Sequence, residues 1–152
     1  MATLNELLTE PGVTDPTNDY IHDDVQFIID KDLRTVAVPD RGIVAGVLGD
    51  KDVNRINFQM DRYYNGFDMS TFTIRVNYLN GNGIPKYYEV DDLTVEGDTM
   101  YFTWLVGSEV TVAVGDVPFV VHMFKTENDV MKQSFYTTIN NTRYLKILDT
   151  IL

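Results

Sequence analysis

Apolar and polar residues alternate along much of the central part of this chain. Ile56, Phe58 and Met60 occupy every second position of one segment, and the segment from Thr71 to Tyr78 repeats the same alternation. Successive side chains of a β-strand point to opposite faces, so each segment has one apolar face and one polar face. The pattern therefore predicts strands that are buried on one side only.

Turn sequences separate the alternating segments at short intervals. The clearest is Asn80-Gly81-Asn82-Gly83, because a tight hairpin turn needs residues that accept a positive φ. Asn65-Gly66 gives a second turn signal inside an aromatic-rich loop that we expect between residues 61 and 70. Strands are predicted at residues 25–30, 33–39, 56–60, 71–79, 86–90, 93–95, 100–106, 109–114, 117–125 and 134–139. About eight to ten short strands with regular turns predict an all-β fold, an antiparallel β-sandwich.

The sequence divides into three parts. Residues 1–24 form an extended acidic arm, residues 25–141 the β-sandwich domain, and residues 142–152 a C-terminal docking segment. The arm contains six acidic residues and no Lys or Arg, and Pro11, Gly12 and Pro16 interrupt any helix beyond Thr3 to Leu8. The arm is either a disordered tail or an extended peptide that orders on a neighbouring subunit.

Both ends of the chain contain apolar residues that are candidates for an interface. Three leucines near the N-terminus could share one face of a short segment, and the spacing in residues 142–152 suits a short amphipathic helix slightly better than a strand. These end candidates are Leu4, Leu7, Leu8, Tyr144, Leu148 and Ile151.

Length and composition indicate one soluble domain made in a cytoplasm. The chain has 152 residues, of which 44% are hydrophobic, and none of its apolar runs approaches the length of about 20 residues that a membrane-spanning helix needs. The N-terminus resembles no signal peptide. The absence of cysteine excludes disulfides, thiolate metal sites and cysteine nucleophiles.

The charge argues against two classes of partner. A formal net charge of −11 makes the chain a poor ligand for nucleic acid and for anionic membranes, because both are bound through Lys and Arg. The acidity either keeps the protein soluble or matches a basic surface on a partner protein.

Few residues suggest chemistry. His122 lies in a strand-like run and His22 in the acidic arm, so neither belongs to a zinc-type ligand set. Asp91 and Asp92 sit near turns, where aspartate bonds its own backbone; calcium binding and acid–base catalysis are the alternatives. The glycine-rich stretch from Gly42 to Lys51 lacks the ending of a phosphate-binding loop. We expect no catalytic residue, no metal site and no cofactor.

Aromatic residues are the more informative candidates. Tyr63, Tyr64 and Phe67 cluster in one loop, and Tyr87 and Tyr88 are adjacent on a strand, where they must face opposite sides. Such residues pack in the core and its rim, form protein–protein interfaces, or stack on sugar rings. We take Tyr63, Tyr64 and Phe67 as interface candidates.

Residues from about 25 to 125 resemble the N-terminal β-domain of bacteriophage baseplate upper proteins and related head-fibre and tail-fibre anchor proteins of phages that infect Gram-positive bacteria. The resemblance is carried by a G-D-x-x-V-x-x-I-x-F core, an N-G-x-D-x-S motif and an F-x-W pair. The motif residues are Gly49, Asp50, Val53, Ile56 and Phe58, then Asn65, Gly66, Asp68 and Ser70, then Phe102 and Trp104.

The resemblance implies a non-enzymatic structural protein of a virion, built as a β-sandwich that forms homo-oligomers, most often trimers. Its partners would be other capsid or tail proteins, and its location the virion, after synthesis in the host cytoplasm. Baseplate proteins of this kind usually continue into a long fibrous region, whereas this sequence stops at Leu152. A capsid decoration, head-fibre or accessory protein therefore fits at least as well as a baseplate or tail adaptor.

Two other functions remain open. The first is a host-receptor module that binds cell-surface carbohydrate through Tyr63, Tyr64 and Phe67. The second is a hydrolase that uses paired carboxylates such as Asp91 and Asp92.

Overall fold

The computed structural model describes residues 25–139 and 143–150, and within these ranges the chain is all-β, as predicted. The strands are β1 (Gln26–Asp30), β2 (Thr35–Ala37), β3 (Val44–Val47), β4 (Asn54–Asp61), β5 (Tyr63–Tyr64), β6 (Phe67–Asp68), β7 (Thr73–Leu79), β8 (Pro85–Glu89), β9 (Leu93–Glu96), β10 (Thr99–Val106), β11 (Gly115–Val117), β12 (Phe119–Glu127), β13 (Val130–Tyr136) and β14 (Leu145–Leu148). Two 3₁₀-helices, η2 (Asp40–Gly42) and η3 (Met69–Thr71), interrupt them.

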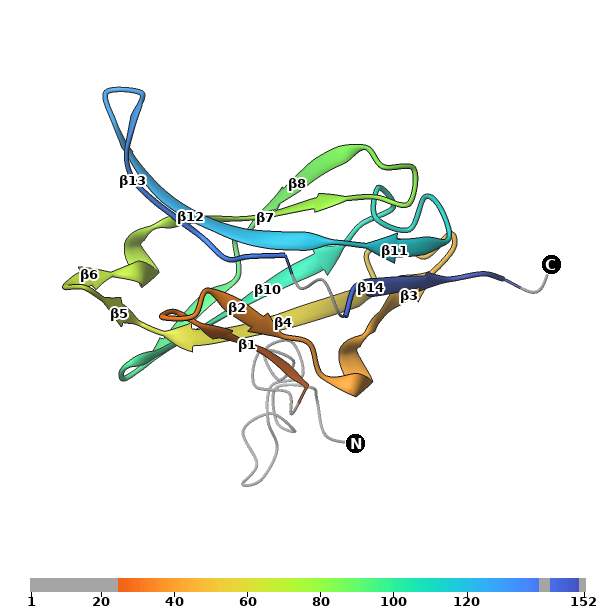
Figure 1. The fold of residues 1–152 in the computed structure, drawn as a ribbon, viewed down its shortest axis with the longest axis horizontal. Coiled ribbons are helices and arrows are strands. Elements are labelled where there is room, and N and C mark those ends of the chain that lie inside the picture. The colour runs from red at the N-terminus through yellow and green to blue at the C-terminus, as the bar shows by residue number, and fades with distance from the viewer. Residues whose placement is uncertain (1–24, 140–142, 151–152) are drawn as a thin grey trace, which may run out of the picture.

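The strands form two larger sheets, a smaller three-stranded sheet and a hairpin (Figure 1). The five-stranded sheet has the order β2-β1-β4-β10-β9, and the four-stranded sheet has the order β13-β12-β7-β8. The three-stranded sheet has the order β11-β14-β3, while β5 and β6 pair with each other. The hairpin of β12 and β13 rises away from the rest of the molecule at one end (Figure 1).

Aromatic side chains join the two larger sheets across a shared core. Phe58 of β4 stacks on Phe102 of β10, with ring centroids 5.0 Å apart, and meets Phe119 of β12 edge-on at 6.0 Å. Trp104 of β10 lies 5.1 Å from the ring of Tyr78 on β7. The two sheets therefore face each other through the apolar positions that alternation in the sequence predicted.

Two strand pairs differ from the antiparallel arrangement that we predicted. β1 pairs with β4 in parallel, and β14 pairs with β3 in parallel. Parallel pairs need a long crossover connection, and here β2, η2 and β3 lie between β1 and β4. The sequence pattern specifies which residues face inward but not which strand lies beside which.

The C-terminal segment forms a strand and not the helix that its spacing slightly favoured. Leu145 and Ile147 of β14 are buried between β11 and β3, so these two residues belong to the core of the same chain. Leu148 is 47% exposed, and Tyr144 is half-buried.

The predicted strand at residues 109–114 is wrong. This segment is a turn in which Val110 and Thr111 are buried, and the Thr111 hydroxyl donates to the carbonyl of Asp50 at 2.5 Å. The predicted glycine-rich loop contains β3, a strand that sequence reasoning missed. In both segments the pairing partner decides the conformation, because short apolar segments suit either a strand or a loop.

Among the described residues, no helix is long and apolar enough to cross a bilayer.

Candidate interaction surface

The outward face of the four-stranded sheet carries an apolar groove. In β7 the inward positions are Ile74, Val76 and Tyr78, so the alternate positions, including Leu79, face away from the core. The antiparallel register places Pro85 of β8 opposite Leu79. A sheet face in contact with water normally carries polar side chains, so apolar residues here need an explanation.

The groove, which we call the outer groove, has a volume of about 480 Å³. Its apolar lining includes Leu79, Pro85, Tyr87, Val120 and Ile139, which come from β7, β8, β12 and the segment after β13. Among the described residues that line it, Lys86 is the one charged residue. The described residues of the chain leave Leu79 40%, Ile139 47% and Tyr87 59% exposed.

Arg75 fixes the aromatic rings beside the outer groove. Its guanidinium carbon lies 4.5 Å from the ring centroid of Tyr87 and 5.0 Å from that of Phe124, and its Nε donates to Glu89 at 3.0 Å. The ion pair is partly exposed and contributes little to stability by itself. Its effect is geometric, because a guanidinium held by Glu89 keeps the Tyr87 ring in one position.

His122 is a packed residue on the same face. Its ring stacks on Tyr136 with centroids 3.9 Å apart, and its Nε2 lies 2.9 Å from the Ser134 hydroxyl. Burial, and secondly the positive charge of Arg75, lowers the pKa of His122 below its usual value. The ring is 5% exposed and therefore fills space at the side of the sheet.

The structure separates the three aromatic residues of the predicted loop. The loop is the β5–β6 hairpin, in which Tyr63 pairs with Asp68 and Tyr64 with Phe67. Tyr64 and Phe67 line a small groove of about 220 Å³ that also includes Arg34 and Phe135, whereas Tyr63 does not. The Arg34 guanidinium donates to the Tyr64 hydroxyl at 3.0 Å.

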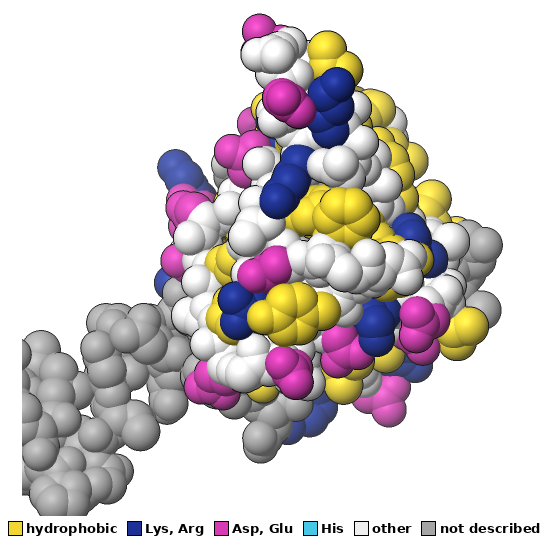
Figure 2. Space-filling model, turned by 90° about the vertical axis from the view of Figure 1, so that its left-hand side faces the viewer, with side chains coloured by type: hydrophobic (Ala, Val, Ile, Leu, Met, Phe, Trp, Pro, Cys, Tyr) yellow, Lys and Arg dark blue, Asp and Glu magenta, His cyan; other side chains and the backbone are white. Residues whose placement is uncertain are grey.

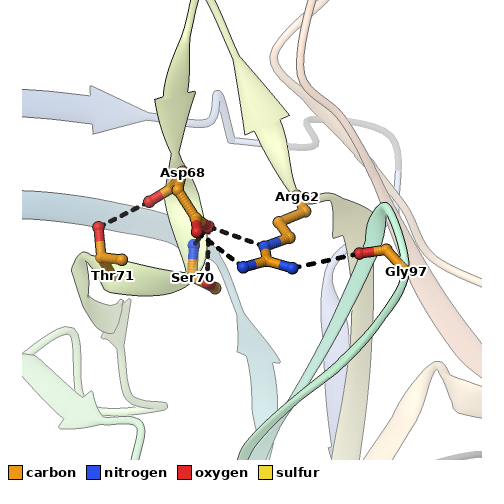
Figure 3. Close-up of polar contacts among 5 residues, drawn as sticks. All are labelled: Arg62, Asp68, Ser70, Thr71 and Gly97. Carbon is orange, nitrogen blue, oxygen red and sulfur yellow. Dashed lines mark hydrogen bonds and ion pairs between the residues drawn. The ribbon is translucent and has the colours of Figure 1, made fainter.

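A polar network holds this hairpin in place (Figure 3). Arg62 contacts both carboxylate oxygens of Asp68, at 3.1 Å and 2.9 Å, and Ser70 donates its amide and its hydroxyl to the same carboxylate. Arg62, and secondly Ser70, holds the pKa of Asp68 well below its usual range. The third guanidinium nitrogen of Arg62, Nη1, donates to the carbonyl of Gly97 at 3.4 Å. The network therefore ties the hairpin to the turn between β9 and β10.

Charged side chains of both signs surround this end of the molecule. Figure 2 shows the end to which the β5–β6 and β12–β13 hairpins point, with apolar side chains along one side of the raised part and acidic and basic side chains intermixed below. Tyr63 and Phe67 are 46% and 43% exposed here, and Val130 and Met131 near the tip of the β12–β13 hairpin are 55% and 46% exposed.

The remaining candidates are not brought together. Asp91 accepts a long hydrogen bond, 3.4 Å, from the Tyr88 hydroxyl. Within residues 25–139 and 143–150, no group of three His, Cys, Asp or Glu residues could hold a metal ion. The end candidates Leu4, Leu7, Leu8 and Ile151 lie outside the described residues.

Sequence reasoning identified Tyr87 among the residues that line the outer groove and missed the other apolar residues of the lining. Tyr87 and Tyr88 were expected to face opposite sides, and Tyr87 is exposed while Tyr88 packs against the core. Leu79, Val120 and Ile139 are not singled out by the sequence, because nothing in their local sequence marks them as exposed. Only the pairing of β7 with β8 and β12 collects them into one surface.

Comparison of the chain with protein-family models gives no match, and comparison with curated protein sequences gives no match either.

Proposed function

We propose that this chain is a non-enzymatic structural protein of a bacteriophage virion, which docks on a larger assembly through the outer groove. We propose that it acts as a homotrimer on the capsid, as a decoration, head-fibre or accessory protein. A baseplate or tail adaptor is the alternative position in the same kind of particle.

The exposed apolar lining of the outer groove is the observation that carries this proposal. Leu79, Tyr87 and Ile139 stay in contact with water in the isolated chain. Covering them with another protein removes apolar area from water at about 25 cal/mol per Å². An exposed aromatic residue in an apolar patch, such as Tyr87, is also typical of the residues that dominate protein–protein binding.

The assignment to a virion is supported by the resemblance of residues 25–125 to phage baseplate and fibre-anchor domains. Its motif residues have structural roles in this fold. Ile56, Phe58 and Trp104 build the core between the two larger sheets, and Asp68 and Ser70 build the network of the β5–β6 hairpin. The motif residues therefore stabilise the fold of the domain, and the proposed function rests on the outer groove.

Purification of particles tests the proposal. Virus particles released from a host that carries this gene are separated on a density gradient, and their proteins are identified by mass spectrometry. We expect the chain to be present in many copies per particle. Particles that lack the chain, in a lysate that contains it in free form, would refute the virion assignment.

A pair of variants tests the surface itself. Leu79→Ser combined with Tyr87→Ser removes the apolar lining, and Tyr63→Ser is the matched control at an exposed aromatic residue outside the outer groove. We expect the control chain to enter particles normally and the groove variant to stay free, with both chains folded by circular dichroism. Sedimentation of the unaltered chain is expected to show a trimer; a monomer at high concentration would contradict the oligomer.

Carbohydrate binding is the second candidate function, and the groove between Tyr64 and Phe67 favours it. An aromatic face beside the Arg34 guanidinium is a combination that can stack on a sugar ring and bond its hydroxyls. A glycan array with the purified chain would show a signal that disappears in Phe67→Ala and persists in Tyr87→Ser. An array without signal removes this candidate.

A further inference from the structure

The β12–β13 hairpin extends beyond the sheet to which it belongs (Figure 1). β12 pairs with β7 only as far as Phe124, opposite Thr73, whereas it pairs with β13 as far as Glu127, opposite Val130. Residues 126–132 are all exposed, so neither face of this extension packs on the core. A two-stranded hairpin in water is only marginally stable by itself. The extension therefore fits an arm that contacts another protein.

The end of this arm presents an apolar side chain beside two carboxylates. Asn128 and Asp129 have φ values of +52° and +63°, as the central residues of a tight hairpin turn require. Val130 follows the turn and is 55% exposed, and the register places Glu127 directly opposite it. Opposite residues of an antiparallel pair share one face. Val130 and Glu127 therefore form one contact surface, with Asp129 in the adjoining turn, and we call these three residues the hairpin tip.

The outer groove matches the hairpin tip in apolarity and in charge. Leu79 and Tyr87 supply exposed apolar area, and Lys86 is the one charged residue among the described residues of the lining. Within residues 25–139 and 143–150, neither Lys86 nor Glu127 belongs to an ion pair. A valine beside a carboxylate is thus complementary to an apolar groove beside an ammonium group.

The hairpin tip cannot enter the groove of its own chain. Val120 of the groove lies near the start of β12, and Asn128 follows the end of the same strand. At about 3.3 Å per residue, an extended strand holds these two residues about 26 Å apart. The contact must therefore join two copies through unlike patches at opposite ends of one sheet. A head-to-tail contact of this kind builds a ring when the rotation between copies closes.

We propose that the hairpin tip of one copy docks in the outer groove of the next copy, so that three chains form a closed head-to-tail ring. Leu79 and Tyr87 cover Val130, and Lys86 pairs with Glu127. This inference rests on the proposed function for the homotrimer, and it names the partner of the outer groove. An altered groove then keeps the chain out of particles because no trimer forms.

Disulfide formation between two single-cysteine chains tests the contact, because the native chain has no cysteine. Val130→Cys places a thiol at the tip, and Leu79→Cys places one in the groove; both native residues are exposed. After mild oxidation of the mixed chains, we expect a covalent dimer on a non-reducing gel. Val130→Cys mixed with Val95→Cys is the matched control and should give none. Val95 is 37% exposed, against 40% for Leu79, but it lies on β9 and outside the groove.

Each chain oxidised alone should give no covalent dimer, because a head-to-tail contact joins unlike patches. A dimer of Leu79→Cys alone would show that two grooves meet, a dimer of Val130→Cys alone would show that two tips meet, and either would overturn the proposal. The chain with both cysteines should give products of two and three chains and none larger. Longer products would show an open row of copies and would overturn the ring.

Charge reversal tests the pairing of Lys86 with Glu127. Lys86→Glu and Glu127→Lys each place like charges at the contact, so each should weaken association by about fivefold or more in sedimentation experiments. The two changes together should restore association, with the far-ultraviolet circular dichroism equal in all chains. Association that stays weak in the combined variant would overturn the pairing.

Failure of this inference is distinguishable from failure of the proposed function. A trimer that is present in particles but forms no disulfide between positions 130 and 79 would overturn the inference alone. A disulfide-linked ring of a chain that never enters particles would support the inference and refute the virion assignment.

Discussion

Arg62 and Asp68 hold the β5–β6 hairpin together through a two-point contact between guanidinium and carboxylate (Figure 3). The two residues stand at the ends of the hairpin that presents Tyr63, Tyr64 and Phe67. A planar guanidinium that bonds both oxygens of a carboxylate fixes distance and direction together. The position of these aromatic side chains therefore depends on a pair that contributes no apolar surface.

Replacing this carboxylate is expected to lower stability in a pH-dependent way. Because the pKa of Asp68 is lower in the folded chain, its contribution is fully present above its unfolded pKa of about 3.9 and is lost as the pH falls through the folded pKa. Asp68→Asn should therefore reduce the urea midpoint at pH 7, and the difference from the unaltered chain should shrink below about pH 4.

The control for this prediction is Asp40→Asn, which breaks the exposed ion pair with Arg143. The Asp40 carboxylate is 93% exposed, so its loss should leave the urea midpoint nearly unchanged. An equal decrease of the urea midpoint in the two variants would show that the two-point contact between Arg62 and Asp68 has no special role in stability.

The two leucines of β14 are expected to differ sharply. Leu145 is completely buried and Leu148 is 47% exposed, although they lie on one short strand. Leu145→Ala should cost about 2–5 kcal/mol in the free energy of unfolding, because it leaves a cavity in the core. Leu148→Ala should change it by no more than about 0.5 kcal/mol. Urea denaturation measures both, and a large loss for Leu148→Ala would mean that this residue is covered.

His122 is expected to make stability fall on mild acidification. Its pKa is lowered in the folded chain, so the unfolded chain takes up a proton first, and stability is lost as the pH drops below the unfolded value of about 6.5. The free energy of unfolding of the unaltered chain, minus that of His122→Gln, should be constant above about pH 7.5 and should decrease toward pH 5.

Proton resonances give a direct measurement of this group. In a chain with His22→Gln, one histidine signal remains, and its titration midpoint should lie below about 6.5. A midpoint above that value would contradict the burial of His122 against Tyr136.

Two glycines of the turn between β7 and β8 should tolerate substitution differently. A Cβ on Gly81 would come within 2.7 Å of the carbonyl oxygen of Ala113, whereas Gly83 has open space and a φ of +73°. Gly81→Ala should cost about 1–3 kcal/mol through overpacking against backbone. Gly83→Ala should cost about 1–2 kcal/mol through its left-handed conformation.

Asparagine separates these two causes. Asn accepts a left-handed conformation more readily than Ala, so Gly83→Asn should be milder than Gly83→Ala. Gly81→Asn should be at least as harmful as Gly81→Ala, because the clash remains. Thermal unfolding of the four variants measures the order, and the reverse order at either glycine would contradict the corresponding cause.

The sequence by itself determined the fold class and many of the strands. Alternation at Ile56, Phe58 and Met60 reports which side of a strand is buried, and this property is local to a few residues. The turn signals are local as well: Asn65 and Gly66 have φ values of +50° and +82° and close the β5–β6 hairpin. Local conformation and one-sided burial are therefore readable without knowledge of the partners.

Tertiary structure alone decided which strands are neighbours and which surface they create. The parallel pairing of β14 with β3 joins residues about a hundred positions apart, and nothing in either segment specifies the other. The outer groove likewise takes Leu79, Tyr87 and Ile139 from separate strands and turns, and of these only Tyr87 was marked by its sequence context. Hydrophobic burial is not directional, so a sequence shows that an apolar side chain will be covered but not by which part of the chain.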